Sequence, residues 1–123
     1  MQEFLPGLRH EYRLDLVVAN GENAAGGLGI TVATTQELLN CGVDAITTGN
    51  HVWAKKEIIP YLDGGELPII RPVNFPPGAP GRGFLLKHQV LVDNLMGRDF
   101  KGEMDCPFRA MDSFLAEVKP DVK

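Results

Sequence analysis

The sequence contains few cysteines and no long apolar stretch. Cys41 and Cys106 are its two cysteines, they lie far apart, and no CxxC pair occurs. A reducing compartment, the cytoplasm, is therefore expected. No apolar stretch approaches the roughly 18 residues of a membrane span, and residues 1–4 lack the basic start and apolar middle of a signal peptide. We expect a cytoplasmic protein without membrane contact.

Basic residues are also few. The chain has 12 Lys and Arg against 16 Asp and Glu, a net charge of -4, and its basic residues are scattered along the sequence. Strong binding to a nucleic-acid polymer through its phosphates is therefore not expected, whereas a small phosphorylated substrate remains open. The glycine-rich segment 24–29 (AAGGLG) lacks the Lys-Ser/Thr of a P-loop and the GxGxxG order, so it does not predict nucleotide binding.

With 123 residues, 44% of them hydrophobic and 23% charged, the chain can form one core and not two. Residues 1–123 are therefore expected to be a single domain or part of one. Helical and strand patterns alternate along the chain, which is the order that builds a parallel sheet covered on both faces. The patterns predict helices over 2–12, 31–40, 53–62 and 107–118, strands over 14–19, 43–48 and 67–70, and a hairpin of 84–87 and 89–95 that reverses near His88.

Residues 71–83, between the last parallel strand and the hairpin, contain four prolines and three glycines. Proline lacks a backbone donor and glycine weakens regular elements, so this segment is predicted to be an ordered loop.

Polar side chains directly follow two predicted buried strands. Glu22 and Asn23 come after the strand over 14–19, and Asn50 and His51 come after the strand over 43–48. The carboxyl ends of parallel strands are where open α/β sheets place their chemistry. Carboxylate and amide oxygens with an imidazole form a ligand set suited to Fe, Mn or Zn rather than to Ca. The sequence therefore predicts a metal-dependent hydrolase.

Each of these residues also has a plainer interpretation. Glu22 is equally typical of a solvated loop glutamate, and Asn23 of an asparagine that caps its own turn. Asn50 and His51 alone would indicate a turn or a helix cap. The occurrence of two such segments at the ends of strands of one sheet favours the metal site, in which Asn50 would ligate a cation and His51 would donate a proton.

Other residues have weaker signals. Trp53 is expected to be a core residue, with base stacking as the alternative. The arginines could bind a substrate phosphate, but exposed surface arginine is the preferred interpretation for each. This applies to Arg71, Arg82, Arg98 and Arg109.

Several long motifs stand along the chain: residues 19–27 (ANGENAAGG), 47–53 (TTGNHVW), 71–78 (RPVNFPPG), 94–98 (NLMGR) and 105–110 (DCPFRA). Together they resemble one known family, the bacterial 2',3'-cyclic-nucleotide 2'-phosphodiesterases of the calcineurin-like metallophosphoesterases. The resemblance covers essentially the whole chain.

The resemblance implies a calcineurin-like metallophosphoesterase fold, an α/β/β/α sandwich, with two divalent or mixed-valence metal ions that are commonly iron. By motif position, Glu22 resembles the bridging metal ligand, Asn23 and Asn50 resemble further metal ligands, and His51 resembles the catalytic proton donor. The implied substrate is a small phosphodiester or a cyclic nucleotide.

The family pattern also includes a Gly-Asp-x-x-Gly-Arg segment before the first helix and a His-x-His pair after the last one, and neither occurs in this sequence. We therefore expect a fold that is incomplete at both ends, about half of the metal site, and little metal binding or activity from this chain alone. The alternative is a catalytically inactive or oligomerising module that retains the middle of the fold, with a second copy of the chain as its partner.

Overall fold

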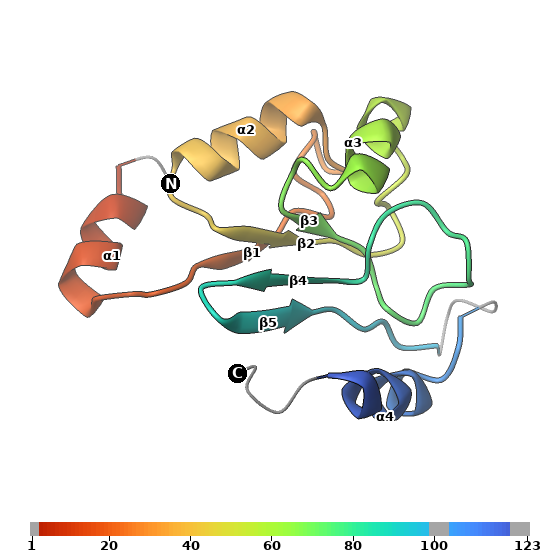
Figure 1. Ribbon diagram of the computed structural model, residues 1–123. Helices are drawn as coiled ribbons and strands as arrows, with labels where there is room; N and C mark the ends of the chain where they lie inside the picture. The colour runs from red at the N-terminus through yellow and green to blue at the C-terminus, as the bar shows by residue number, and fades with distance from the viewer. Residues whose placement is uncertain (1–2, 99–103, 119–123) are drawn as a thin grey trace.

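The computed structural model describes residues 3–98 and 104–118, and it shows four layers (Figure 1). Helices α2 and α3 cover one face of a sheet made of β1, β2 and β3, the two-stranded sheet β4-β5 lies on the other face, and α4 forms the outer layer beyond it. The elements are α1 (Leu5–Tyr12), β1 (Val18–Asn20), α2 (Val32–Asn40), β2 (Ala45–Thr47), η1 (Lys56–Ile58), α3 (Ile59–Gly64), β3 (Ile69–Ile70), β4 (Phe84–Lys87), β5 (Val90–Asp93) and α4 (Pro107–Glu117). The predicted α/β/β/α arrangement is confirmed.

The first sheet is parallel, in the order β1-β2-β3. Asn20, the last residue of β1, pairs with Thr47, the last residue of β2, and Thr47 also pairs with Ile70, the last residue of β3. The three strands therefore end at the same edge of the sheet, and the segments that follow them begin side by side.

Both faces of this sheet are buried because side chains alternate along each strand. Ile46 and Ile69 point into the core beneath the helices, whereas Ala45 and Ile70 point into a second core between the two sheets. The larger cluster contains Ile30, Val43, Ile46, Val52, Ile58, Leu62, Ile69 and Phe75, and the smaller one contains Ala45, Ile70, Leu85 and Val92. This alternation explains why neighbouring residues of β2 and β3, Ala45 with Ile46 and Ile69 with Ile70, are all apolar.

The helix α2 begins as its sequence predicts. Thr31 is its N-cap and accepts the backbone N–H of Thr34, while the Thr34 hydroxyl accepts the backbone N–H of Thr31, so that the two form a capping box. The Arg9 guanidinium of α1 lies 2.5 Å from Asp44, which also accepts the backbone N–H of Val17. Asp44, the residue before β2, therefore connects that strand to α1 and to the residue before β1.

The strands predicted over 43–48 and 67–70 are shorter in the structure, and two further elements differ more from the sequence prediction. The strand predicted over 14–19 starts only at Val18. The backbone N–H of Val17 donates to the Asp44 carboxylate and its carbonyl accepts the backbone N–H of Asp44, so the regular pairing of β1 with β2 begins one residue later. The helix predicted over 53–62 is instead a turn, the short helix η1 and then α3. Pro60 lies at the start of α3 and has no N–H, so a continuous helix through it would lose a bond.

The hairpin β4-β5 confirms the predicted reversal near His88. His88 and Gln89 form its two-residue turn, with φ angles of 50° and 62°. Positive φ at both central residues is the type I′ geometry, whose twist matches that of the flanking strands.

The Pro- and Gly-rich segment 71–83 is an ordered loop, as predicted, but two of its arginines are not exposed. Arg71 donates to the carbonyls of Ala79 and Pro72, and Arg82 donates to the carbonyl of Leu67 at 3.2 Å. Burial lowers the pKa of Arg71, with Asp63 opposing the shift. The surface interpretation is therefore wrong for Arg71 and Arg82, whose guanidinium groups satisfy loop carbonyls, and is confirmed for Arg98 and Arg109, which are exposed.

Candidate active site at the ends of two parallel strands

The two polar segments meet at the carboxyl edge of the parallel sheet. The backbone N–H of Gly21 donates to Thr47 at 2.9 Å and so continues the pairing of β1 and β2 by one step. Glu22 and Asn23 therefore leave β1 next to the point where Asn50 and His51 leave β2. Residues 28 positions apart in the sequence become neighbours in this way.

The Glu22 side chain is directed toward the second segment. The Asn20 side chain accepts the backbone N–H of Glu22 at 2.8 Å, an Asx-type bond that turns the chain as soon as β1 ends. The Glu22 Oε1 atom accepts the backbone N–H of His51 at 3.3 Å and lies 3.9 Å from His51 Nδ1. The carboxylate of one segment is thereby fixed against the backbone of the other.

Gly49 makes this close approach possible. A Cβ atom on Gly49 would lie 2.5 Å from Cδ and 2.6 Å from Oε2 of Glu22, well inside contact distance. The absent side chain therefore leaves the space in which the Glu22 carboxylate lies. A similar constraint holds at Gly21, whose Cβ would lie 2.7 Å from Ile46 Cγ2 in the core.

His51 contacts Asn23 as well as Glu22. Its Nδ1 atom lies 2.9 Å from Asn23 Oδ1, and its side chain is 38% exposed. Asn50 is half-buried in the turn over 50–53 that follows β2. The structure thus brings Glu22, Asn23 and His51 into direct contact and places Asn50 beside them in the chain.

This donor set suits part of a metal site. It offers a carboxylate, two amide groups and an imidazole, and the space beside Gly49 holds the carboxylate at the strand ends. Within residues 3–98 and 104–118, however, no group of three or more His, Cys, Asp and Glu residues is close enough to hold a metal ion. The residues present therefore fit an incomplete ligand set.

Sequence reasoning did not identify Asn20 and Gly49. Asn20 stands two residues before Glu22 at the end of a strand, which is the spacing of an Asx turn, so the pattern was readable. Gly49 carries no such signal by itself, because only the folded sheet brings the Glu22 carboxylate against it.

Trp53 is a core residue, as expected. It is half-buried, its ring centroid lies 5.1 Å from that of Phe75, and its indole N–H donates to the Pro80 carbonyl at 3.2 Å. These contacts fix the loop over 71–83 to the turn that carries His51.

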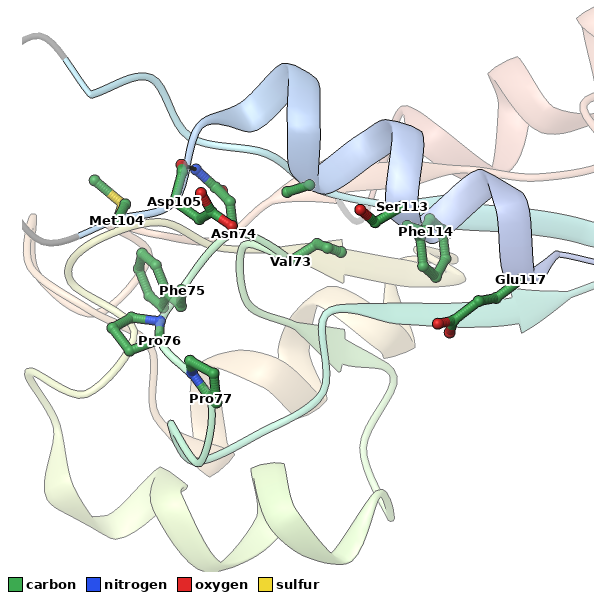
Figure 2. A pocket seen from close by; sticks show the side chains of 11 residues that line it. Val73, Asn74, Phe75, Pro76, Pro77, Met104, Asp105, Ser113, Phe114 and Glu117 are labelled. Atoms are coloured by element: carbon green, nitrogen blue, oxygen red, sulfur yellow. Dashed lines mark hydrogen bonds between the residues drawn. The ribbon is translucent and has the colours of Figure 1, made fainter.

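A large cavity of about 690 Å³ lies elsewhere, between the loop over 73–77 and α4 (Figure 2). Phe75 and Pro77 face it from the loop, and Ser113, Phe114 and Glu117 face it from α4. None of Glu22, Asn23, Asn50 and His51 lines it. In the part of the chain that the structure describes, no helix is both long and apolar enough to cross a membrane.

The four layers and the polar strand ends define a protein with the metallophosphoesterase-type phosphatase fold. The chain belongs to the YmdB-like protein family, whose model matches residues 1–123. It is 41% identical to the 2',3'-cyclic-nucleotide 2'-phosphodiesterase of Bacillus subtilis (strain 168), an alignment that covers 96% of this chain and 46% of that protein.

Two solved structures share the fold. The crystal structure of a hypothetical protein from Thermus thermophilus matches with a TM-score of 0.87 and 43% identity, covering 96% of this chain and 47% of that one. A phosphatase from Mycoplasma pneumoniae matches with a TM-score of 0.83 and 24% identity, covering 96% of this chain and 45% of that one. The chain therefore spans about half the length of these relatives.

Proposed function

We propose that this chain carries about half of the dinuclear metal site of a phosphodiesterase that hydrolyses 2',3'-cyclic nucleotides or related small phosphodiesters. The observation that carries the proposal is the convergence of Glu22, Asn23 and His51 from the ends of two adjacent strands. The name of the Bacillus subtilis relative supports the substrate class.

Each residue has a role in the proposal. The Glu22 carboxylate would bridge two cations, because each of its oxygens can bind one, and the amide oxygens of Asn23 and Asn50 would be further ligands. When bound, two Fe, Mn or Zn ions would neutralise phosphate charge and make hydroxide available near neutral pH. Ligands outside the described residues would complete the site, since these residues alone do not.

His51 would supply the proton. Hydrolysis adds hydroxide to phosphorus and breaks one bond between phosphorus and an ester oxygen, which leaves as an alkoxide unless it is protonated. A ring nitrogen of His51 would donate a proton to that leaving oxygen, which is general acid catalysis. With a side chain 38% exposed, His51 is accessible to such a substrate.

A chimera tests the proposal. This chain would replace the matching 46% of the Bacillus subtilis relative, and hydrolysis of 2',3'-cyclic AMP would be measured with Mn or Fe. We expect hydrolysis that falls by at least about 100-fold in the His51→Ala variant, within the range for loss of a general acid. A folded chimera that binds metal and does not hydrolyse the substrate would contradict the proposal. So would a chimera whose rate of hydrolysis is unchanged by His51→Ala.

The alternative is an inactive or oligomerising module. The incomplete ligand set among the described residues supports this alternative as well. Metal analysis and sedimentation of the purified 123-residue chain separate the two. For the phosphodiesterase we expect weak metal binding and little hydrolysis from the chain alone, and full binding only in the chimera. A module would bind no metal in either context.

A further inference from the structure

The cavity between the loop over 73–77 and α4 is held open by contacts near both ends of the helix. Before α4, the Asn74 amide donates to the Asp105 carbonyl at 3.0 Å, and the Asp105 backbone N–H donates to the Asn74 carbonyl at 3.0 Å. In the C-terminal half of α4, the ring centroid of Phe114 lies 5.0 Å from that of Phe84 on β4. The volume of about 690 Å³ that these contacts enclose is that of a usual small-molecule site.

One face of α4 lines this cavity. Ala110, Ser113, Phe114 and Glu117 occupy positions i, i+3, i+4 and i+7, which lie on the same side of a helix. Phe75 faces them from the loop (Figure 2). The cavity therefore has an aromatic ring on each of its two walls, between which a flat apolar group can pack.

The charged side chains of the cavity have one sign. Among the described residues that line it there are two carboxylates, Asp105 and Glu117, and no Lys, Arg or His. Both are exposed, and they lie at opposite ends of the cavity (Figure 2). The backbone N–H of Cys106 donates to Asp105 Oδ1 at 2.7 Å, which orients that carboxylate. A ligand in this cavity meets negative charge wherever it meets charge.

We propose that the cavity binds a small organic cation, an ammonium or amidinium group on a flat apolar body. The body would pack between Phe75 and Phe114, whose ring faces also attract cations. The N–H groups of the cation would donate to the Glu117 or Asp105 carboxylate and to the Ser113 hydroxyl. An anion of the same shape would be repelled, so the sign of the charge gives the selectivity. The inference goes beyond the proposed function, because none of the candidate metal ligands lines the cavity.

Titration of the ¹⁵N-labelled 123-residue chain with benzamidine tests this proposal. Benzoate is the matched control ligand, since it has the same ring and the opposite charge. Binding is followed in the amide spectrum and in the fluorescence of Trp53, the single tryptophan, whose ring centroid lies 5.1 Å from that of Phe75. We expect saturable shifts at Phe75, Ser113 and Phe114, and binding of benzamidine about 10-fold tighter than that of benzoate, because two attractions become repulsions.

Three variants locate the site. Ala110→Leu adds bulk to the cavity wall and should weaken benzamidine binding by about 10-fold or more, because the ligand and the new side chain would overlap. Glu117→Gln removes one charge and should weaken binding by about 2- to 5-fold, as for one exposed ion pair. Asp112→Asn is the control for Glu117→Gln, since Asp112 is exposed on the same helix and does not line the cavity.

Benzoate binding as tightly as benzamidine would overturn the proposal, as would shifts centred away from the cavity. So would the absence of saturable shifts up to about 10 mM benzamidine, which is enough to fill even a millimolar site. Equal effects of Glu117→Gln and Asp112→Asn would also overturn it. If Ala110→Leu disturbs the spectrum of the free chain, the two ligands and the Glu117→Gln variant still decide the outcome.

Discussion

At the scale of single residues, the candidate site depends on what Gly49 lacks. The Glu22 carboxylate lies where a Cβ atom of Gly49 would be, and it accepts the backbone N–H of His51 from that place. Glu22 can therefore reach the backbone of His51 only because the residue between them in space, Gly49, has no side chain.

We predict that Gly49→Ala displaces the Glu22 carboxylate and destabilises the chain by about 1–3 kcal/mol, the usual cost of overpacking. Urea denaturation would measure the loss, and the His51 amide resonance would report the broken bond. Gly7→Ala is the matched control, because nothing lies within 4 Å of its Cβ position, and alanine in helix α1 should stabilise by roughly 0.5–1 kcal/mol. Equal stability of Gly49→Ala and Gly7→Ala would refute the packing argument.

A second prediction at this scale concerns Cys106, the N-cap residue of α4. A hydrogen bond from the Arg109 backbone lowers the pKa of its thiol, helped by that of Phe108 and by the charges of Arg98 and Arg109. A lower pKa means more thiolate at about pH 7.5, so alkylation by iodoacetamide should be faster than for an ordinary thiol of pKa about 8.5.

The rate of this alkylation should follow pH with a midpoint below that ordinary value. Cys41 is 5% exposed and should stay protected until the chain unfolds. Mass spectrometry of the two cysteine peptides separates them. Faster labelling of Cys41 than of Cys106 in the folded chain would show that this account of Cys106 is incorrect.

At the scale of elements, the loop over 71–83 is held by a buried asparagine. Asn74 is 1% exposed, its amide N–H groups donate to the carbonyls of Met96 and Asp105 at 2.7 and 3.0 Å, and its Oδ1 accepts the backbone N–H of Met96 at 3.0 Å. It therefore joins the loop to the chain after β5 and to the segment before α4.

We predict that Asn74→Ala lowers the free energy of unfolding by about 1–3 kcal/mol, because buried backbone groups lose their partners. Urea denaturation measures it. Asn40→Ala is the control, since Asn40 is exposed at the end of α2 and its loss should change stability by about 0.5 kcal/mol or less. Equal stability of the two variants would contradict this role of Asn74.

The elements also show what the sequence could predict. The apolar patterns predicted the order of helices and strands, and the Thr31 cap and the turn at His88 were readable because short-range chemistry decides them. The roles of Arg71 and Arg82 could not be predicted from the sequence. Their hydrogen-bond partners are backbone carbonyls that come near these side chains only in the folded chain.

At the scale of the whole molecule, the four layers place the site on one edge of the inner parallel sheet, with the large cavity beside α4 in a different region. The positions of the candidate residues after two strands were predictable from the sequence. Their contacts were not, because these depend on the register that aligns Asn20 with Thr47. We propose that metal binds at the ends of β1 and β2.

Paramagnetic broadening by Mn²⁺ in the ¹⁵N-labelled 123-residue chain tests this most directly, since it detects weak binding. We predict that substoichiometric Mn²⁺ broadens the amide signals of Glu22, Asn23, Asn50 and His51 first, and that Glu22→Gln abolishes the effect. Glu57→Gln, on an exposed residue of η1, should leave it unchanged. Broadening centred elsewhere, or none at Glu22 and His51, would contradict the account.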